Sequence, residues 1–153
     1  MNVLRRLFGG LPGKVNDPVF GALTQRDGAW SGTMAWDHSP VPFALTVYRD
    51  DEVPSQADRV MFETLRRDYV ALRPALQEAL SELWSASRDI DATESLKFGG
   101  VFDLWAKLNL QAAGLYPDGH AELIFGFAGE NLPEGAFIVA VHGKKVAPLE
   151  YVE

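Results

Sequence analysis

The alternation of apolar and polar residues divides the chain into two strand-rich blocks separated by a long helical stretch. An Asp27-Gly28 pair lies in the first block and an Asp118-Gly119 pair in the second, and each favours a two-residue hairpin turn. The helical pattern runs from residue 55 to about 86. We therefore expect an α+β domain. Its antiparallel sheet has about seven strands, three before and four after a long Pro-kinked helix.

The first block is expected to be a three-stranded meander. Residues 20–26 and 29–36 flank the first turn, and this pairing places Leu23 opposite Gly32. A large residue facing a glycine indicates the core side of the hairpin. Alternating apolar positions over 43–47 then predict the third strand.

The helix has both a start signal and a continuous apolar stripe. Ser55 is the expected N-cap, with Asp58 three residues later as its capping-box partner. Because the stripe keeps its register across Pro74, we expect one kinked helix or two nearly collinear ones. The stripe consists of Met61, Leu65, Tyr69, Leu72, Leu76, Leu80, Leu83 and Trp84.

The second block is predicted to begin with a hairpin around Asp118-Gly119 that pairs Gly114 with Leu123. The same register places Tyr116, Ala112 and Leu110 on the core face. Residues 137–141 are apolar on both sides, which is typical of a central strand, and 146–151 form the last strand.

The first eighteen residues are expected to form a flexible segment before a single domain over 19–153. Gly9 to Pro18 is rich in glycine and proline and is typical of a linker. The basic and apolar start has no apolar run long enough for a signal peptide, and no stretch approaches the length of a membrane span.

Charge and cysteine content limit the possible functions. The chain has 21 acidic and 14 basic residues, for a formal net charge of −7. An acidic body disfavours nucleic acid as a partner and suits a basic protein. The absence of cysteine excludes disulfides and thiolate chemistry and fits a cytoplasmic protein.

No spacing in the sequence predicts a catalytic, cofactor-binding or metal site. His38, His120 and His142 all fall in turns, where their polarity explains them, and sequence alone does not show whether they converge. The glycine pairs have neither the spacing nor the lysine of a phosphate loop. The four tryptophans fall on predicted apolar faces and are expected to pack in the core.

Short motifs at both ends of the domain resemble small bacterial domains of unknown function. The first is Asp17-Pro-Val-Phe-Gly-Ala-Leu followed by Trp30-Ser-Gly, and the closing segment has Gly135-Ala-Phe-Ile-Val-Ala-Val and then Gly143-Lys-Lys-Val. Those domains commonly have Gly-His where this chain has Gly135-Ala136. Some of them are regarded as immunity proteins of polymorphic-toxin systems, so the resemblance implies stoichiometric binding of a toxin without catalysis.

The leading hypothesis is a non-enzymatic bacterial protein that binds another protein through acidic loops, above all Asp50, Asp51 and Glu52. The alternative is a small-molecule-binding protein or an enzyme with a cleft between sheet and helix, for which His120 or His142 near Glu122 would be the polar groups. A third possibility is a structural subunit that pairs through an exposed strand edge.

Overall fold

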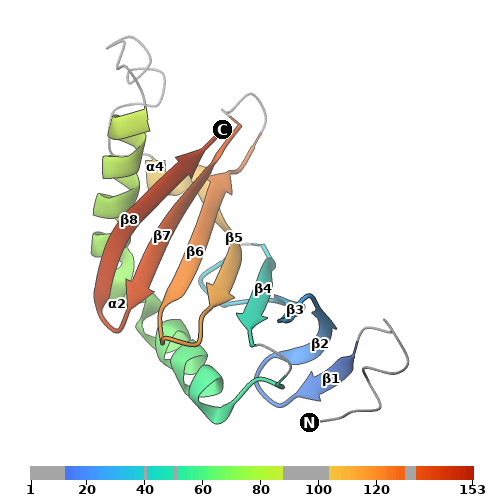
Figure 1. Cartoon of the computed structure of the whole chain (residues 1–153). Helices are drawn as coiled ribbons and strands as arrows, with labels where there is room; N and C mark the ends of the chain where they lie inside the picture. The colour runs from blue at the N-terminus through green and yellow to red at the C-terminus, as the bar shows by residue number, and fades with distance from the viewer. Residues whose placement is uncertain (1–12, 40, 50–51, 88–103, 130–133) are drawn as a thin grey trace.

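The computed structural model describes residues 13–39, 41–49, 52–87, 104–129 and 134–153. It has an α+β architecture in which a long helix packs against one eight-stranded sheet with the strand order β1 to β8 (Figure 1). The elements are β1 (Lys14–Asp17), β2 (Gly21–Arg26), β3 (Ala29–Met34), β4 (Phe43–Tyr48), α2 (Gln56–Ser87), α4 (Leu104–Lys107), β5 (Leu108–Leu115), β6 (Ala121–Phe127), β7 (Ala136–His142) and β8 (Lys145–Val152).

Two antiparallel meanders, β1–β4 and β5–β8, are joined side by side into this sheet. Their junction is the parallel pair β4–β5, in which Ala44 lies beside Ala112 and Val47 beside Leu115. Parallel neighbours need a crossover connection, and the segment containing α2 provides it. The expected division of the sheet into strands before and after the helix in the chain is confirmed. Four strands precede the helix, where three were expected, and four follow it.

The additional strand is β1, which lies within the stretch that the sequence analysis assigned to the flexible segment. Val15 pairs with Leu23 of β2, and the Gln25 amide extends the ladder by donating to the Gly13 carbonyl at 2.7 Å. The sequence pattern did not predict this strand because it is only four residues long, lies among glycines and prolines, and is specified by its pairing with β2.

The first hairpin has the predicted register. Arg26 pairs with Ala29 across Asp27 and Gly28, whose φ angles of 48° and 75° are those of a type I′ turn. A Cβ on Gly32 would lie 2.8 Å from a Leu23 methyl group and 2.8 Å from the Ala22 carbonyl oxygen. The glycine is therefore needed for the close approach of the two strands.

The second hairpin differs from the prediction by one residue. Leu115 pairs with Ala121, and the Tyr116 amide donates to the His120 carbonyl at 3.0 Å, so the loop consists of residues 117–119. Gly119, with φ of 90°, occupies the position that such a longer loop requires in the left-handed region.

A register shift between Leu110 and Ala112 then changes which side of β5 faces the core. Leu110 is buried as expected, but beyond the bulge the buried residues are Ala113 and Leu115, and Tyr116 lies on the opposite face. The expected core positions Ala112 and Tyr116 were therefore wrong, because one extra residue reverses the alternation.

Helix α2 is continuous through Pro74 and connects the two meanders. In its first half Phe62 packs against Phe20 and Trp36, whose ring centroids lie 5.2 and 5.5 Å away. In its last turns Trp84 packs against Phe127 and Phe137. The predicted stripe thus faces the core on both sides of the proline, although Phe62, which is fully buried, was not included in it.

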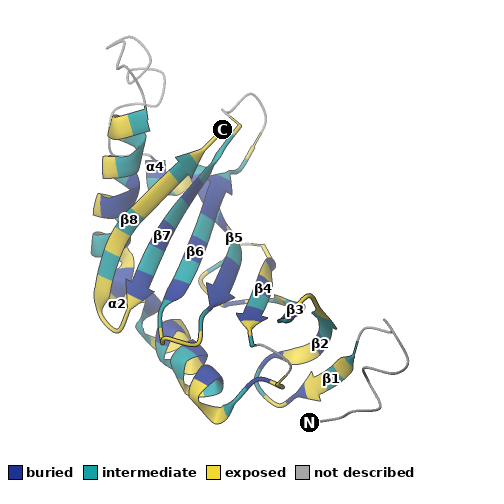
Figure 2. Ribbon diagram, in the orientation of Figure 1, coloured by how far each residue is buried: buried dark blue, intermediate teal, exposed yellow. Residues whose placement is uncertain are grey.

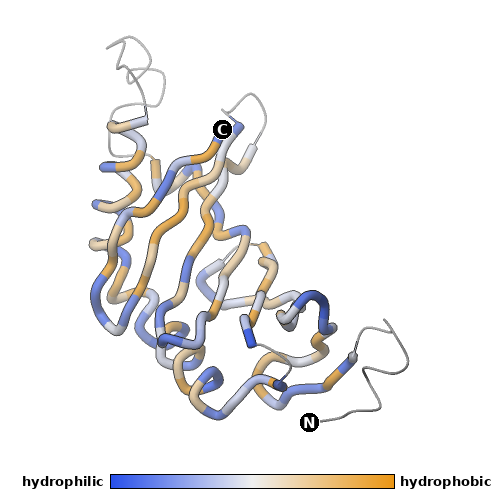
Figure 3. The backbone as a smooth tube through the Cα atoms, in the orientation of Figure 1, coloured by the Kyte–Doolittle hydropathy of each residue, from blue (hydrophilic) through white to orange (hydrophobic). Residues whose placement is uncertain are grey.

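The core lies between α2 with α4 and one face of the sheet (Figure 2). Hydrophobic residues are frequent along β6 and β7, the inner strands of the second meander (Figure 3). All four tryptophans belong to the core or pack against it, as expected: Trp30, Trp36, Trp84 and Trp105. Within the described residues, neither helix has the length and apolar character needed to cross a membrane.

Candidate functional site

The acidic loop predicted to bind a partner leads from β4 to α2. Asp50 and Asp51 lie outside the described residues. Glu52 is exposed, and its backbone carbonyl accepts a 2.7 Å hydrogen bond from the Trp30 indole nitrogen. The loop is thus anchored to the core at its third acidic residue, while the Glu52 side chain remains accessible to solvent.

An ion pair holds the two ends of this loop together. The Arg49 guanidinium donates to both oxygens of Asp58, at 2.9 and 3.0 Å, and to the Ser55 hydroxyl at 2.8 Å. The predicted capping box is present, because the Ser55 amide donates to Asp58 and the Asp58 amide donates to Ser55. Burial raises the pKa of Asp58, but the hydrogen bonds from Arg49 and Ser55 outweigh it, so the pKa lies below its ordinary value.

The motif residues that carry the family resemblance have structural roles. Asp17 accepts hydrogen bonds from the Val19 and Phe20 amides and from Arg59 of α2, which secures the β1–β2 turn on the helix. Burial raises the pKa of Asp17, and these hydrogen bonds together hold it below its ordinary value. Phe20 is buried, and Gly21 has the positive φ of 71° that ends the turn.

A column of three stacked rings lies on the sheet face opposite the helices. It joins Tyr48 at the end of β4, Tyr116 after β5 and His120 before β6. The Tyr48 and Tyr116 centroids are 4.5 Å apart with planes at 19°, and those of Tyr116 and His120 are 4.4 Å apart at 7°. Gly114 allows this packing, since a Cβ there would lie 3.2 Å from Tyr48 and 3.3 Å from Tyr116.

Two carboxylates border the ring column. The Tyr116 hydroxyl donates to Glu122 at 2.9 Å, and His120 contacts Asp118 through Nδ1 and Glu122 through Nε2, the latter at 3.6 Å. Burial, with Glu122 and Tyr48, raises the pKa of the Tyr116 hydroxyl, which therefore stays neutral and a hydrogen-bond donor. The column offers aromatic surface next to negative charge, the chemistry that attracts guanidinium and ammonium groups.

The turns that contain Gly119 and His142 lie next to each other. A Cβ on Gly119 would lie 3.7 Å from Nε2 of His142, so the β5–β6 and β7–β8 turns are neighbours. His38 lies elsewhere, in the connection between β3 and β4. Among the residues described, no group of three or more His, Cys, Asp or Glu side chains is arranged to hold a metal ion.

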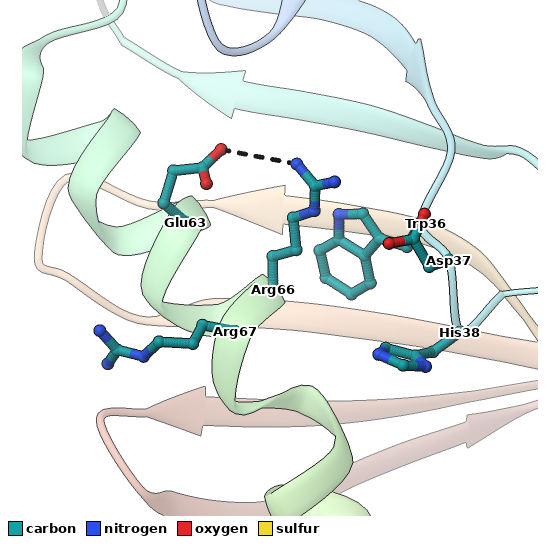
Figure 4. Close-up of a pocket in the computed structure, with 6 residues that line it drawn as sticks. All are labelled: Trp36, Asp37, His38, Glu63, Arg66 and Arg67. Atoms are coloured by element: carbon teal, nitrogen blue, oxygen red, sulfur yellow. Dashed lines mark ion pairs between the residues drawn. The ribbon is translucent and has the colours of Figure 1, made fainter.

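A polar pocket of about 260 Å³ lies between the β3–β4 connection and α2 (Figure 4). Its lining residues are Trp36, Asp37, His38, Glu63, Arg66 and Arg67. The Trp36 indole nitrogen is buried and has no hydrogen-bond partner among the described residues. The Arg66 guanidinium is 4.0 Å from Glu63, beyond the length of a hydrogen bond.

The acidic loop as a binding site stays a prediction. Sequence analysis named His120 with Glu122 but missed the two tyrosines of the ring column, and it missed the pocket. Tyr48 and Tyr116 are adjacent only because β4 and β5 pair in parallel, and no local pattern signals that pairing. Trp36 was assigned to the end of the second strand and His38 to the turn after it. Their position beside the polar side of the helix depends on how α2 lies on the sheet. Comparison with known proteins found no match for this chain among family models, curated proteins or solved structures.

Proposed function

We propose that this chain is a non-enzymatic module that binds a basic protein, as an immunity-type inhibitor binds its toxin. The ring column carries the proposal, on the sheet face that neither described helix covers. Tyrosines are enriched at the centres of protein interfaces because they bury a large rigid surface and keep a polar tip. Tyr48 is 39% exposed, which is high for a tyrosine stacked on a neighbouring ring.

Charge supports a basic partner. Asp118 and Glu122 border the column, and the chain that leaves β4 after Tyr48 continues into the acidic loop of Asp50, Asp51 and Glu52. An arginine or lysine placed over Tyr48 would meet an aromatic face and carboxylates together. A net charge of −7 would also accelerate association with a positively charged protein at low salt.

Affinity capture tests the proposal. The tagged chain is used to retain proteins from its native lysate at low and high salt, and the retained protein is then titrated against purified variants by calorimetry. We expect one basic protein that is lost as the salt concentration rises. Tyr48→Ala and Glu122→Gln should each weaken its binding by about tenfold or more, the size typical of interface anchors.

Glu78→Gln is the matched control, because it removes the same charge from an exposed position on α2. It should bind as the unsubstituted chain does. Equal binding by all three variants would contradict the ring column as the interface. Failure to retain any protein at either salt concentration would contradict protein binding and favour the small-molecule alternative.

A further inference from the structure

We infer that the pocket between the β3–β4 connection and α2 binds a small zwitterion with the chemistry of a free α-amino acid. This inference is independent of the proposed function, because the pocket contains none of the ring-column residues. The ligand carries a carboxylate and an ammonium group a few bonds apart.

The first observation is the indole nitrogen of Trp36. The side chain is 4% exposed, and its ring is held by Phe43, Phe62 and Tyr69 at centroid distances of 4.8, 5.5 and 5.2 Å. A buried N–H without an acceptor is costly, and none of the described residues supplies one. Because Trp36 lines the pocket, its indole places an unsatisfied donor next to the cavity, and a carboxylate oxygen that reached this nitrogen would supply the missing acceptor.

The second observation is the balance of charge in the lining. Arg66 and Arg67 line the pocket together with Asp37 and Glu63, so the four formal charges cancel. Arg66 lies between Glu63 and Trp36, whereas Arg67 points away from Asp37 (Figure 4). An anion would meet two carboxylates and a cation would meet two guanidinium groups. A zwitterion places its carboxylate toward Arg66 and Trp36 and its ammonium group toward Glu63 or Asp37, which satisfies both signs.

Arg66 is the side chain best able to take the carboxylate. Arg67 already donates to the adjacent Asp68 at 2.9 and 3.3 Å, whereas the one interaction of Arg66 with the described part of the chain is the 4.0 Å ion pair with Glu63. Arg66 is also 46% exposed and free to turn toward the indole nitrogen. The volume of about 260 Å³ is below the usual range for drug-sized ligands, which favours a small metabolite.

Calorimetric titration with the full chain tests this inference. The probes are the free L-amino acids, their N-acetyl derivatives, their amides, and inorganic phosphate. We expect one or more free amino acids to bind, and expect the N-acetyl derivative and the amide of the same amino acid to bind at least tenfold more weakly. Binding of phosphate or the N-acetyl derivative as tight as that of the free amino acid would overturn the zwitterion, as would no binding by any probe.

Two variants locate the binding. Trp36→Phe removes the N–H donor and keeps an aromatic side chain. Arg66→Gln removes the guanidinium group. Each should weaken binding about tenfold. The controls are Trp105→Phe, an indole outside the pocket, and Arg26→Gln, an exposed arginine on β2; both should bind normally.

Thermal unfolding of each variant without ligand establishes that it is folded, so that lost binding is not lost structure. Unchanged binding by folded Trp36→Phe and Arg66→Gln would overturn the assignment to this pocket. Because neither variant alters the ring column, a loss of amino-acid binding with retained protein binding would separate this site from the proposed interface.

Discussion

Individual buried charges in this protein connect elements that are distant in sequence. Arg49 at the end of β4 pairs with Asp58 in the first turn of α2, and Arg59 of α2 pairs with Asp17 at the end of β1. Both carboxylates are nearly inaccessible to solvent, with 2% and 7% exposure for Asp58 and Asp17. Such pairs affect the free energy of unfolding mainly because removing one partner leaves the other charge buried and unpaired. They also fix the position of the start of the helix relative to the sheet.

Asp58→Asn tests this role, because it removes the negative charge and changes the shape of the side chain very little. We expect the free energy of unfolding at pH 7 to fall by about 2 kcal/mol, because Arg49 loses its charged partner and the capping box loses an acceptor. The folded-state pKa of Asp58 is lowered, so its contribution is present above the unfolded value near 4 and is lost as the pH falls through the folded value. The difference between the two proteins should therefore shrink at pH 3.

Urea denaturation at pH 7 and pH 3 measures both effects. The control is Asp68→Asn, whose partner Arg67 is 72% exposed; this variant should be about as stable as the unsubstituted protein at both pH values. A pH-independent difference for Asp58→Asn would show that the charge of the carboxylate is not what matters.

At the level of elements, the two halves of α2 have different packing partners and are separated by Pro74. Proline removes the hydrogen bond to the carbonyl four residues earlier, which here is that of Val70. Val70 and Pro74 are both exposed, so water can reach this carbonyl. The proline therefore sits where its cost to the helix is smallest.

Pro74→Ala is expected to raise the free energy of unfolding by about 1 kcal/mol. The gain in helix propensity and one hydrogen bond exceeds the loss of proline's restriction of the unfolded chain. Chemical denaturation measures the change, with Glu78→Ala as an exposed helix control expected within about 0.5 kcal/mol. A decrease in stability would mean that the two halves require the proline's geometry to reach both meanders.

The alternation of apolar and polar residues predicted β2, β3, β4 and β6 and their buried faces, because one face of each strand is more accessible to solvent than the other. It failed in β5, where the extra residue at Gln111 reverses the faces, and at β1, which is too short to show a pattern. The acidic loop stays a prediction. The two tyrosines of the ring column and the pocket could not be predicted, since the column depends on β4–β5 pairing and the pocket depends on helix placement.

On the scale of the whole molecule, α2 makes one folding unit out of two meanders. Its first half shares the aromatic cluster of Phe20 and Trp36, and its end shares that of Phe127 and Phe137. Neither meander buries its apolar face without the helix. The edge strand β8 carries Pro148, which lacks a backbone donor and disfavours pairing of another chain along β8; the hypothesis of a subunit that pairs through a strand edge stays a prediction.

Cooperativity should therefore survive damage at either end of the helix. Phe62→Ala and Trp84→Ala are each expected to cost about 3 kcal/mol, and in both variants far-ultraviolet circular dichroism and tryptophan fluorescence should report one coincident transition. Val70→Ala, on the exposed side of the same helix, should cost less than about 0.5 kcal/mol. Two separate transitions in either core variant would show that the meanders fold independently.

The parallel junction has a consequence for the protein during its synthesis on the ribosome. The inner edge of β4 has its partner in β5, which emerges only after the whole of α2 and the segment following it. At ~5–20 residues per second, the nascent β1–β4 meander waits on the order of several seconds with an unpaired apolar strand at its border. During this interval Phe43, Leu45 and Val47 are open to other nascent chains, which makes the β4 edge the place where chaperone binding or misassembly would occur.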